Sequence, residues 1–365
     1  IGSELPIGLN SKKKFHNQLL GEIMINFIND YNAGAAPEIL DALVKINSQE
    51  FVPYGEDSLC DEARELIKFE LERNDVDIHF MEGGTQANMT VISSALRSHE
   101  GVIATVSGHI ATHETGAIES TGHKVITVPH HNGKMKIADI EEALAFHDDE
   151  HKVKPRMIYI SQSTEWGSIY TKAELAEIYE FAQGHNLFLY VDGARLGAAL
   201  TSKAADFTMA DMAKYADAFT IGGTKNGIFI GEAVVITNPL LKTEFRYAIK
   251  QKGALMAKGW LLGVQFKELF RDGLFYRLAE YANNQSEKIK ETLADIGVEM
   301  KSDSPTNQLF PIFPMSFIME LSQNFGFQII EKVGDDQAVI RFVTSWATGD
   351  VAVSALIATL AKYRR

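Results

Sequence analysis

The chain has 365 residues, with 35 basic and 48 acidic side chains and a net charge of −13. Its 45% hydrophobic and 23% charged residues are typical of a globular protein and exclude a disordered or fibrous class. The negative charge disfavours nucleic acid and anionic membranes as partners, because the average field repels phosphates. The length fits a large domain plus a smaller one.

The cysteine content and the N-terminal residues bear on location. Cys60 is the only cysteine, so an intrachain disulfide and a zinc site of clustered cysteines are both excluded. The first residues, Ile1–Leu9 followed by Lys12–Lys14, lack the basic-then-apolar order of a secretory signal. No apolar run reaches membrane-spanning length. We therefore expect a cytoplasmic protein with no membrane partner.

Short β-rich runs alternate with amphipathic segments from about residue 60 to residue 240. The expected strands are Val76–Met81, Val102–Val106, Lys124–Val128, Met157–Ile160, Phe188–Val191, Ala218–Ile221 and Ala233–Ile236. The expected helices between them are Thr85–Arg97, Ala111–Ser120, Ile137–Phe146, Lys172–Gly184 and Met209–Tyr215. This alternation predicts an α/β fold in which a mainly parallel, seven-stranded sheet is covered by helices on both faces.

The pattern changes after Asn238-Pro239. Long helical stretches, three short strands and a closing helix are expected at Leu262–Arg271, Leu274–Ala294, Asn307–Ile312, Phe327–Lys332, Ala338–Val343 and Val351–Tyr363. We predict a large domain over residues 20–252 and a smaller C-terminal α/β domain over residues 253–365, to which residues 1–19 can also belong.

Two residues carry most of the chemical information. Asp192 and Lys225 each follow an apolar strand, and ligands of open α/β sheets bind at the carboxyl ends of the strands. A lysine can bind the aldehyde of pyridoxal 5'-phosphate (PLP), and a carboxylate can keep the pyridine nitrogen protonated. Taken singly, a surface lysine and a helix-capping aspartate are the commoner readings. Together they predict a PLP site.

Two further motifs support this prediction. Gly84 and Thr85 stand where a strand turns into a helix, which suits an anion, although a plain turn is the simpler reading. His109 and His113 would share a helix face, but the metal-binding His-Glu-x-x-His order is missing. We therefore expect His109 to stack on the cofactor ring or to accept a substrate proton.

Two arginines are candidates for substrate binding. Arg195 follows Asp192 by three residues, and Arg341 interrupts an apolar strand. A structural ion pair would explain either one. The alternative is that both guanidinium groups bind the carboxylate of an amino acid, in a clamp between the two domains.

With these residues placed, the chain resembles the threonine aldolase group of PLP enzymes, which has the aspartate-aminotransferase-like fold (fold type I). The resemblance extends from about Phe27 to Thr348. It rests on the segments Asp192–Arg195, Tyr54–Asp57, Gly84–Asn88, Gly108–Ile110 and Arg341–Thr344.

The resemblance implies a role for each candidate residue. Lys225 would bind the cofactor, Asp192 would pair with the ring nitrogen and His109 would stack on the ring. Gly84 and Thr85 would hold the phosphate. The remaining assignments are Arg195 and Arg341 at the substrate carboxylate, His151 near the substrate hydroxyl, and Tyr54 in an active site shared between subunits of a homodimer or homotetramer.

Some positions depart from the family pattern. Asn29 replaces a serine that helps to hold the carboxylate, and Thr224 replaces the serine before the lysine. Ser161–Thr164 replaces a Glu-Asn-Thr-His run. Lys258 stands where a neighbouring subunit usually contributes a phosphate-binding arginine.

The resemblance implies cleavage of a β-hydroxy-α-amino acid, threonine or allo-threonine, to glycine and an aldehyde. The alternative within PLP chemistry is β-elimination of the tryptophanase and tyrosine phenol-lyase type, and aminotransfer is a weaker one. A non-catalytic binding protein with the same fold is the third hypothesis, and it predicts no cofactor absorbance.

Overall fold

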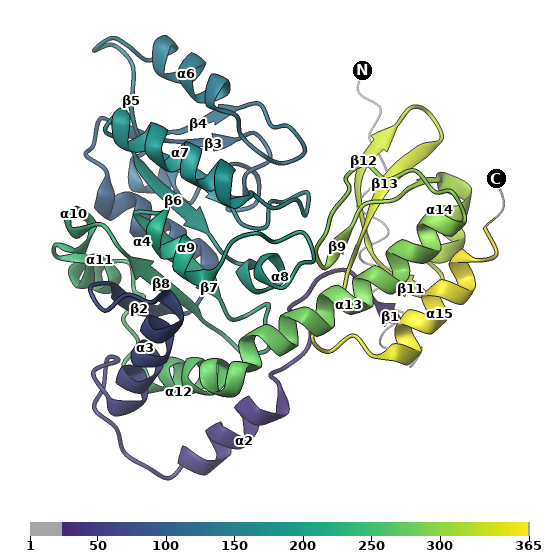
Figure 1. Cartoon of the computed structure of the whole chain (residues 1–365), viewed down its shortest axis with the longest axis horizontal. Helices are drawn as coiled ribbons and strands as arrows, with labels where there is room; N and C mark the ends of the chain where they lie inside the picture. Colours follow the sequence, from purple (N-terminus) through teal and green to yellow (C-terminus); the bar gives the residue numbers. More distant parts are fainter. Residues whose placement is uncertain (1–23, 364–365) are drawn as a thin grey trace.

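The computed structural model describes residues 24–363, so residues 1–19, assigned provisionally to the small domain, lie outside the described residues. The chain forms a larger and a smaller lobe, and the long helix α13 (Leu274–Asp295) runs from one to the other (Figure 1).

The larger lobe is built on a seven-stranded sheet with the order β2-β8-β7-β6-β5-β3-β4. Its strands are β2 (Asp77–Met81), β3 (Glu100–Thr105), β4 (Val125–Val128), β5 (Lys154–Ser161), β6 (Phe188–Asp192), β7 (Ala218–Gly222) and β8 (Glu232–Ile236). β3 to β7 run parallel, whereas β8 is antiparallel to both of its neighbours. The predicted mainly parallel sheet is confirmed.

Successive residues of each strand face opposite sides of the sheet, which divides the core in two. On β5, Ile158 and Ile160 belong to one hydrophobic cluster, while Met157 and Tyr159 belong to the other. The first cluster is covered by α3 (Ser58–Leu71), α6 (Ile137–Phe146), α7 (Lys172–Gly184) and α9 (Met209–Lys214). The second is covered by α4 (Gly84–Ala95) and α11 (Phe245–Gln251). The result is the expected three-layer α/β/α arrangement.

Further helices complete the larger lobe. They are α2 (Pro37–Ile46), α8 (Leu196–Leu200), α10 (Pro239–Lys242) and α12 (Trp260–Phe270). α12 packs against α2 and α3, and a Cβ on Gly263 would lie 2.5 Å from the Cys60 Sγ atom. The boundary proposed after residue 252 stays a prediction, since α12 beyond it contacts these earlier helices.

The smaller lobe has its own sheet and core. Strands β10 (Ile312–Pro314), β13 (Gln337–Val343) and β12 (Gln328–Val333) are neighbours in that order, and β9 (Gln308–Leu309) also pairs with β13. Helices α14 (Met315–Leu321) and α15 (Asp350–Leu360) pack in the same cluster as part of α13. β1 (Ile25–Asn26) pairs in parallel with β11 (Phe325–Gly326). The start of the described chain therefore joins this lobe.

Two expected elements differ from the structure. The single strand expected at Asn307–Ile312 is two strands, because the chain is interrupted at Phe310 and Pro311, and proline has no N–H to donate to a ladder. The helix expected at Ala111–Ser120 is wrong. Only α5 (His109–Thr112) is α-helical, since the chain turns at Thr115 and Gly116 with φ of 52° and 72°, and a short 3-10 turn follows at Glu119–Thr121.

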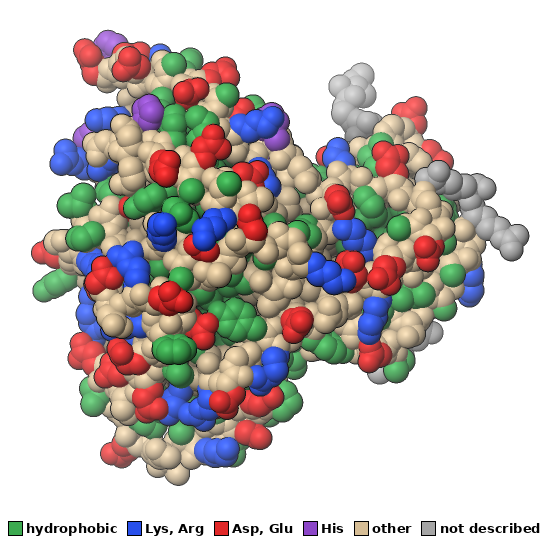
Figure 2. Space-filling model, viewed as in Figure 1, with side chains coloured by type: hydrophobic (Ala, Val, Ile, Leu, Met, Phe, Trp, Pro, Cys, Tyr) green, Lys and Arg blue, Asp and Glu red, His purple; other side chains and the backbone are tan. Residues whose placement is uncertain are grey.

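The surface agrees with an ordinary globular protein. On the face seen in Figure 2, basic side chains are interspersed with acidic ones. None of the helices among residues 24–363 is long and apolar enough to cross a membrane. Within the same residues there is no group of three or more His, Cys, Asp or Glu side chains that could hold a metal ion.

Candidate active site

A pocket opens at the edge of the large sheet where the parallel strands end. It is lined by Tyr31, Glu82, Gly83, Gly84, Thr85, His109, Ser161, Ser163, Glu165, Asp192, Ala194, Arg195, Thr224, Lys225 and Glu232. The space within this rim, part of it open to solvent, is about 890 Å³. Seven residues expected from the sequence meet here: Gly84, Thr85, His109, Asp192, Arg195, Thr224 and Lys225.

Asp192, the last residue of β6, is held by hydrogen bonds to both carboxylate oxygens. The Oδ2 atom accepts from Tyr159 Oη at 2.7 Å and from Asn88 Nδ2 at 3.0 Å, and Oδ1 accepts from the Ala194 N–H at 2.9 Å. Burial alone would raise the pKa of Asp192. The charge of His109, these hydrogen bonds and the charge of Lys225 outweigh it, so the pKa is lowered. Asp192 is therefore a buried carboxylate that stays ionised.

Lys225 follows β7 and reaches the pocket beside Asp192. Glycines allow the two strand ends to approach closely: a Cβ on Gly193 would lie 1.9 Å from the Thr220 carbonyl oxygen, and one on Gly222 would lie 2.4 Å from the Ala194 carbonyl oxygen. Burial and the charge of Arg195 lower the pKa of Lys225, against the opposing effect of the nearby acids. A lowered pKa increases the fraction of neutral, nucleophilic amine.

His109 begins α5 and is oriented by Glu114. Its Nδ1 atom lies 2.9 Å from Glu114 Oε1, and the Glu114 side chain is fully buried. Because a carboxylate accepts hydrogen bonds, Nδ1 carries the proton and Nε2 is left for the pocket. Asn88 Nδ2 also donates to Glu114, at 2.8 Å. One network thus joins His109, Glu114, Asn88, Asp192 and Tyr159.

The beginning of α4 presents free backbone amides to the pocket. Gly83 is the N-cap and no side chain caps the helix. Nothing lies within 4 Å of the Cβ positions of Gly83 and Gly84, so the space beside them is open. The first N–H groups of a helix have no intrahelical partner and attract anions. Thr224, on the opposite side, hydrogen-bonds to the backbone of Gly231.

The two candidate arginines differ in their partners. Arg195 makes an ion pair with buried Asp30, with Nε 2.7 Å from Oδ2 and Nη2 3.0 Å from Oδ1. Arg341 on β13 meets only amide oxygens, those of Gln308 and Gln328, and its Nε atom is buried without a partner among the described residues. Burial and the charge of Arg195 lower the pKa of Arg341 to about 10. Arg341 is a cation without an acidic partner in the described chain.

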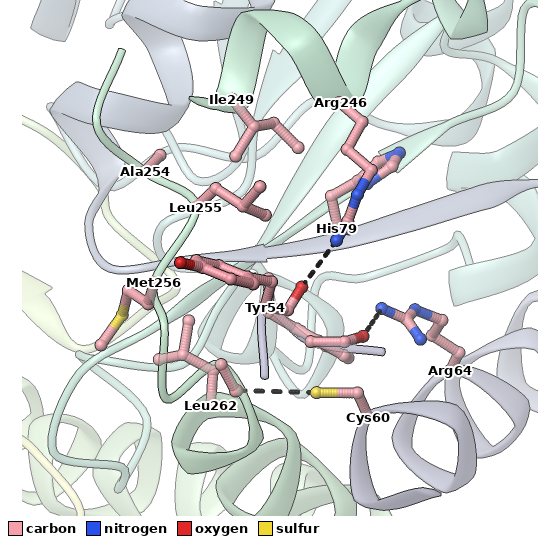
Figure 3. A pocket seen from close by; sticks show the side chains of 13 residues that line it. Tyr54, Cys60, Arg64, His79, Arg246, Ile249, Ala254, Leu255, Met256 and Leu262 are labelled. Atoms are coloured by element: carbon pink, nitrogen blue, oxygen red, sulfur yellow. Dashed lines mark hydrogen bonds between the residues drawn. The ribbon is translucent and has the colours of Figure 1, made fainter. Parts of the chain in front are cut away.

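Five expected residues, Arg341 among them, do not line the pocket of their own chain. Asn29 lies one residue from Asp30 and accepts from the Tyr31 N–H. Lys258 is exposed in the loop before α12. Tyr54 lies in a second, smaller hollow, which Arg246 and the Ala254–Met256 loop also line (Figure 3).

His151 needs a correction. It is exposed in the turn that precedes β5, and its N–H donates to Asp149 Oδ1. The pocket lies at the carboxyl end of β5, beside Ser161 and Glu165. His151 therefore stands at the opposite edge of the sheet and cannot reach a substrate in this pocket.

Sequence reasoning missed two pocket carboxyls, Glu165 and Glu232. Glu165 Oε1 accepts from Ser161 Oγ at 2.6 Å and from the His109 N–H at 2.9 Å. Burial raises the pKa of Glu165 and raises that of Glu232 to about 8. The signal for Glu165 was its place in the loop that follows β5, at the same sheet edge as Asp192 at the end of β6. Glu232 begins β8, a strand that was not expected to run antiparallel.

Comparisons with known proteins agree with this geometry. The family model described as β-eliminating lyase matches residues 26–314. A low specificity L-threonine aldolase of Pseudomonas sp. is 34% identical over 340 residues, which cover 92% of this chain and 96% of the relative. A solved threonine aldolase from Leishmania major is 47% identical with a TM-score of 0.91, covering 92% of this chain and 98% of that one. Thermus thermophilus aspartate aminotransferase, at 13% identity and a TM-score of 0.71, shares the fold.

Proposed function

The chain belongs to the β-eliminating lyase family, and we propose that it is a PLP-dependent aldolase that cleaves a β-hydroxy-α-amino acid, threonine or allo-threonine, to glycine and an aldehyde. The observation that carries the proposal is the convergence of Lys225, Asp192 and His109 in one pocket. The names of its threonine aldolase relatives support the same activity.

The residues present fit PLP. When bound, PLP supplies an aldehyde for a lysine amine and a protonated pyridine ring that accepts the electrons of a breaking bond. Lys225 offers an amine with a lowered pKa, and ionised Asp192 suits a protonated ring nitrogen. The open amides beside Gly83 and Gly84 suit the phosphate.

Glu165 is the group we assign to the proton of the substrate hydroxyl. Its Oε1 is occupied by Ser161 and His109, which leaves Oε2 for a substrate. A carboxyl whose pKa is raised by burial is a stronger proton acceptor than an ordinary one, and it can return the proton. Removal of the hydroxyl proton accompanies cleavage of the Cα–Cβ bond, which releases the aldehyde. A proton returned to Cα then completes glycine.

Arg341 and Arg195 are the groups we assign to the substrate carboxylate. Asp30 fixes Arg195 through Nε and Nη2. Arg341 has no acidic partner in the described chain and keeps a buried Nε free. A carboxylate beside Arg341 would therefore satisfy a charge and a donor that the described residues leave unpaired.

Product analysis tests this function against β-elimination, which the family's name keeps as the second candidate. We expect purified protein with PLP and L-threonine or L-allo-threonine to release acetaldehyde and glycine in equal amounts. Ammonia and a keto acid in place of these products would instead support elimination, beginning with loss of the Cα proton.

We also propose that the active site is shared in a homodimer or homotetramer. Tyr31, which lines the pocket, is 51% exposed, and Phe229 and Tyr54 are 45% and 39% exposed, so each of these aromatic rings is available to a second subunit. Mixing inactive Tyr54→Ala and Lys225→Ala subunits tests this proposal. Shared sites predict that hybrids regain activity, whereas separate sites predict none. A cytoplasmic location remains a proposal, as does the absence of a nucleic-acid partner.

A further inference from the structure

Glu232 reaches the pocket because its strand runs against its neighbours. β8 is antiparallel to β2 and β7, and its first residue, Glu232, pairs with Met81 and Gly222, the last residues of those strands. A residue at the start of β8 therefore lies at the same sheet edge as the carboxyl ends of the parallel strands. It sits between the loop that begins at Glu82 and the loop that contains Thr224.

The surroundings of Glu232 are those of an anion site. It lines the pocket together with Gly83, Gly84, Thr85 and Thr224. Its Oε2 atom is buried and has no hydrogen-bond partner among residues 24–363, and no ion pair among these residues includes Glu232. An unpaired buried polar atom costs free energy unless something else satisfies it.

The protonation state decides whether such a group can adjoin a phosphate. An ionised carboxylate would repel the anion, whereas a neutral carboxylic acid can donate one hydrogen bond to it. Burial, with the charge of Asp192, raises the pKa of Glu232 to about 8. The charge of Lys225 and a hydrogen bond from the Thr224 hydroxyl lower the pKa of Glu232, but they do not return it to the ordinary value of 4.5. Glu82, next to Met81, also lines the pocket, and its Oε2 is likewise buried and unpartnered.

We propose that Glu232 is a neutral hydrogen-bond donor to the cofactor phosphate, acting beside the free amides at the start of α4. The inference rests on the proposed function and adds a residue to it. Retention of the cofactor then depends on a proton held by Glu232, and it weakens as that proton is lost above neutral pH.

The test measures binding of 4'-deoxypyridoxine 5'-phosphate, which has the ring and the phosphate but no aldehyde for Lys225, beside 4'-deoxypyridoxine, which also lacks the phosphate. Fluorescence titration gives the Kd of each for wild type, Glu232→Gln and Glu232→Ala. Glutamine keeps the shape and an N–H donor without a titrating proton, so it is the matched control. Circular dichroism and a melting curve establish that each variant is folded.

We expect Glu232→Gln to bind the phosphorylated probe within about twofold of wild type at pH 7, and Glu232→Ala to bind it about tenfold more weakly, the scale of one hydrogen bond to a charged group. The unphosphorylated probe should bind all three proteins alike. Wild-type affinity for the phosphorylated probe should fall between pH 7 and 9 more steeply than that of Glu232→Gln.

Other outcomes overturn the proposal. An equal loss of affinity in Glu232→Gln and Glu232→Ala would mean that an ionised Glu232 holds a cation, and equal effects on both probes would place Glu232 away from the phosphate. If wild type binds neither probe and forms no visible band with PLP, it is the proposed function that fails. If Glu232→Ala does not fold, the pH comparison of wild type with Glu232→Gln still decides.

Discussion

The active-site pocket and the Tyr54 hollow are both lined by charged side chains, but the partners of these side chains differ. In the hollow, Arg64 donates to the carbonyl oxygens of Ile78 and Gly55, and Arg246 donates to that of Tyr54 (Figure 3). These cations hold backbone segments in place. Lys225 lines the pocket and, like Arg341 on β13, has no acidic partner within hydrogen-bonding distance among the described residues. Cationic donors that lack an acidic partner, rather than charge alone, therefore indicate a binding site.

The largest effect should come from removing the buried charge of Asp192. We expect Asp192→Asn to lower kcat/KM about 10³-fold, the upper scale for loss of one preorganised electrostatic group. Tyr159→Phe is the control, because it removes one hydrogen bond to Asp192 and keeps the charge, so its loss should be about tenfold or smaller. Steady-state aldehyde release measures both. Equal losses would show that packing matters here rather than charge.

A smaller effect is expected from Glu165, the carboxyl we assign to the hydroxyl proton. Glu165→Gln should lower kcat about 10²-fold, as for other lost general acid–base groups, with little change in cofactor absorbance. Its control is His151→Gln at the opposite edge of the sheet, which should leave kcat unchanged. A reversed result, with His151 needed and Glu165 dispensable, would contradict the mechanism.

Substrate affinity should depend on Arg341 more than on an arginine with a local ion pair. Arg341→Ala should raise KM about thirtyfold, the scale of lost hydrogen bonds to a charge, with a smaller change in kcat. Arg73 is paired with Asp75, with Nη2 2.7 Å from Oδ2, so Arg73→Ala should leave KM unchanged. An unaltered KM in Arg341→Ala would remove that arginine from the substrate site.

Within the hollow, His79 should affect the stability of the protein rather than its activity. Burial lowers the pKa of His79 from 6.5 to about 4, and its Nε2 has no partner among the described residues. Because the folded protein disfavours the charged imidazole, its stability is highest above pH 6.5, the unfolded-state pKa of His79. The stability then decreases as the pH falls to the folded-state pKa of about 4. When the pH is lowered from 7 to 4, the free energy of unfolding of wild type should fall by about 3 kcal/mol more than that of His79→Phe. Urea unfolding of both proteins at pH 7 and at pH 4 measures this difference. An equal decrease in the free energy of unfolding for the two proteins would contradict the prediction.

The pattern of apolar runs was enough to locate the seven strands of the large sheet, because buried parallel strands read as short β-rich runs. It could not supply strand direction, so Glu232 was missed although it adjoins the predicted Ala233–Ile236. His151 was assigned from the resemblance alone, and the loop that holds it precedes β5, at the edge of the sheet opposite the pocket. The turn at Thr115 and Gly116 was hidden by the helical spacing of His109 and His113.

The site was predictable where one residue type has a distinctive chemistry, as for Lys225 and Asp192. Glu114 and Asn88 could not be assigned, because their roles depend on contacts between segments far apart in the chain. Asn88 Nδ2, for example, lies 3.0 Å from Asp192 Oδ2 across more than a hundred positions. Tertiary contacts of this kind leave no local pattern in the sequence.

The most direct test of the account is the absorbance spectrum of wild type and Lys225→Ala after addition of PLP, followed by borohydride reduction and mass mapping of the labelled peptide. If Lys225 binds the cofactor, wild type shows a visible band and a reduced adduct on Lys225, and the variant shows neither. A wild-type protein that forms no band, or an adduct on another lysine, would contradict the central claim that Lys225 and Asp192 build a PLP site.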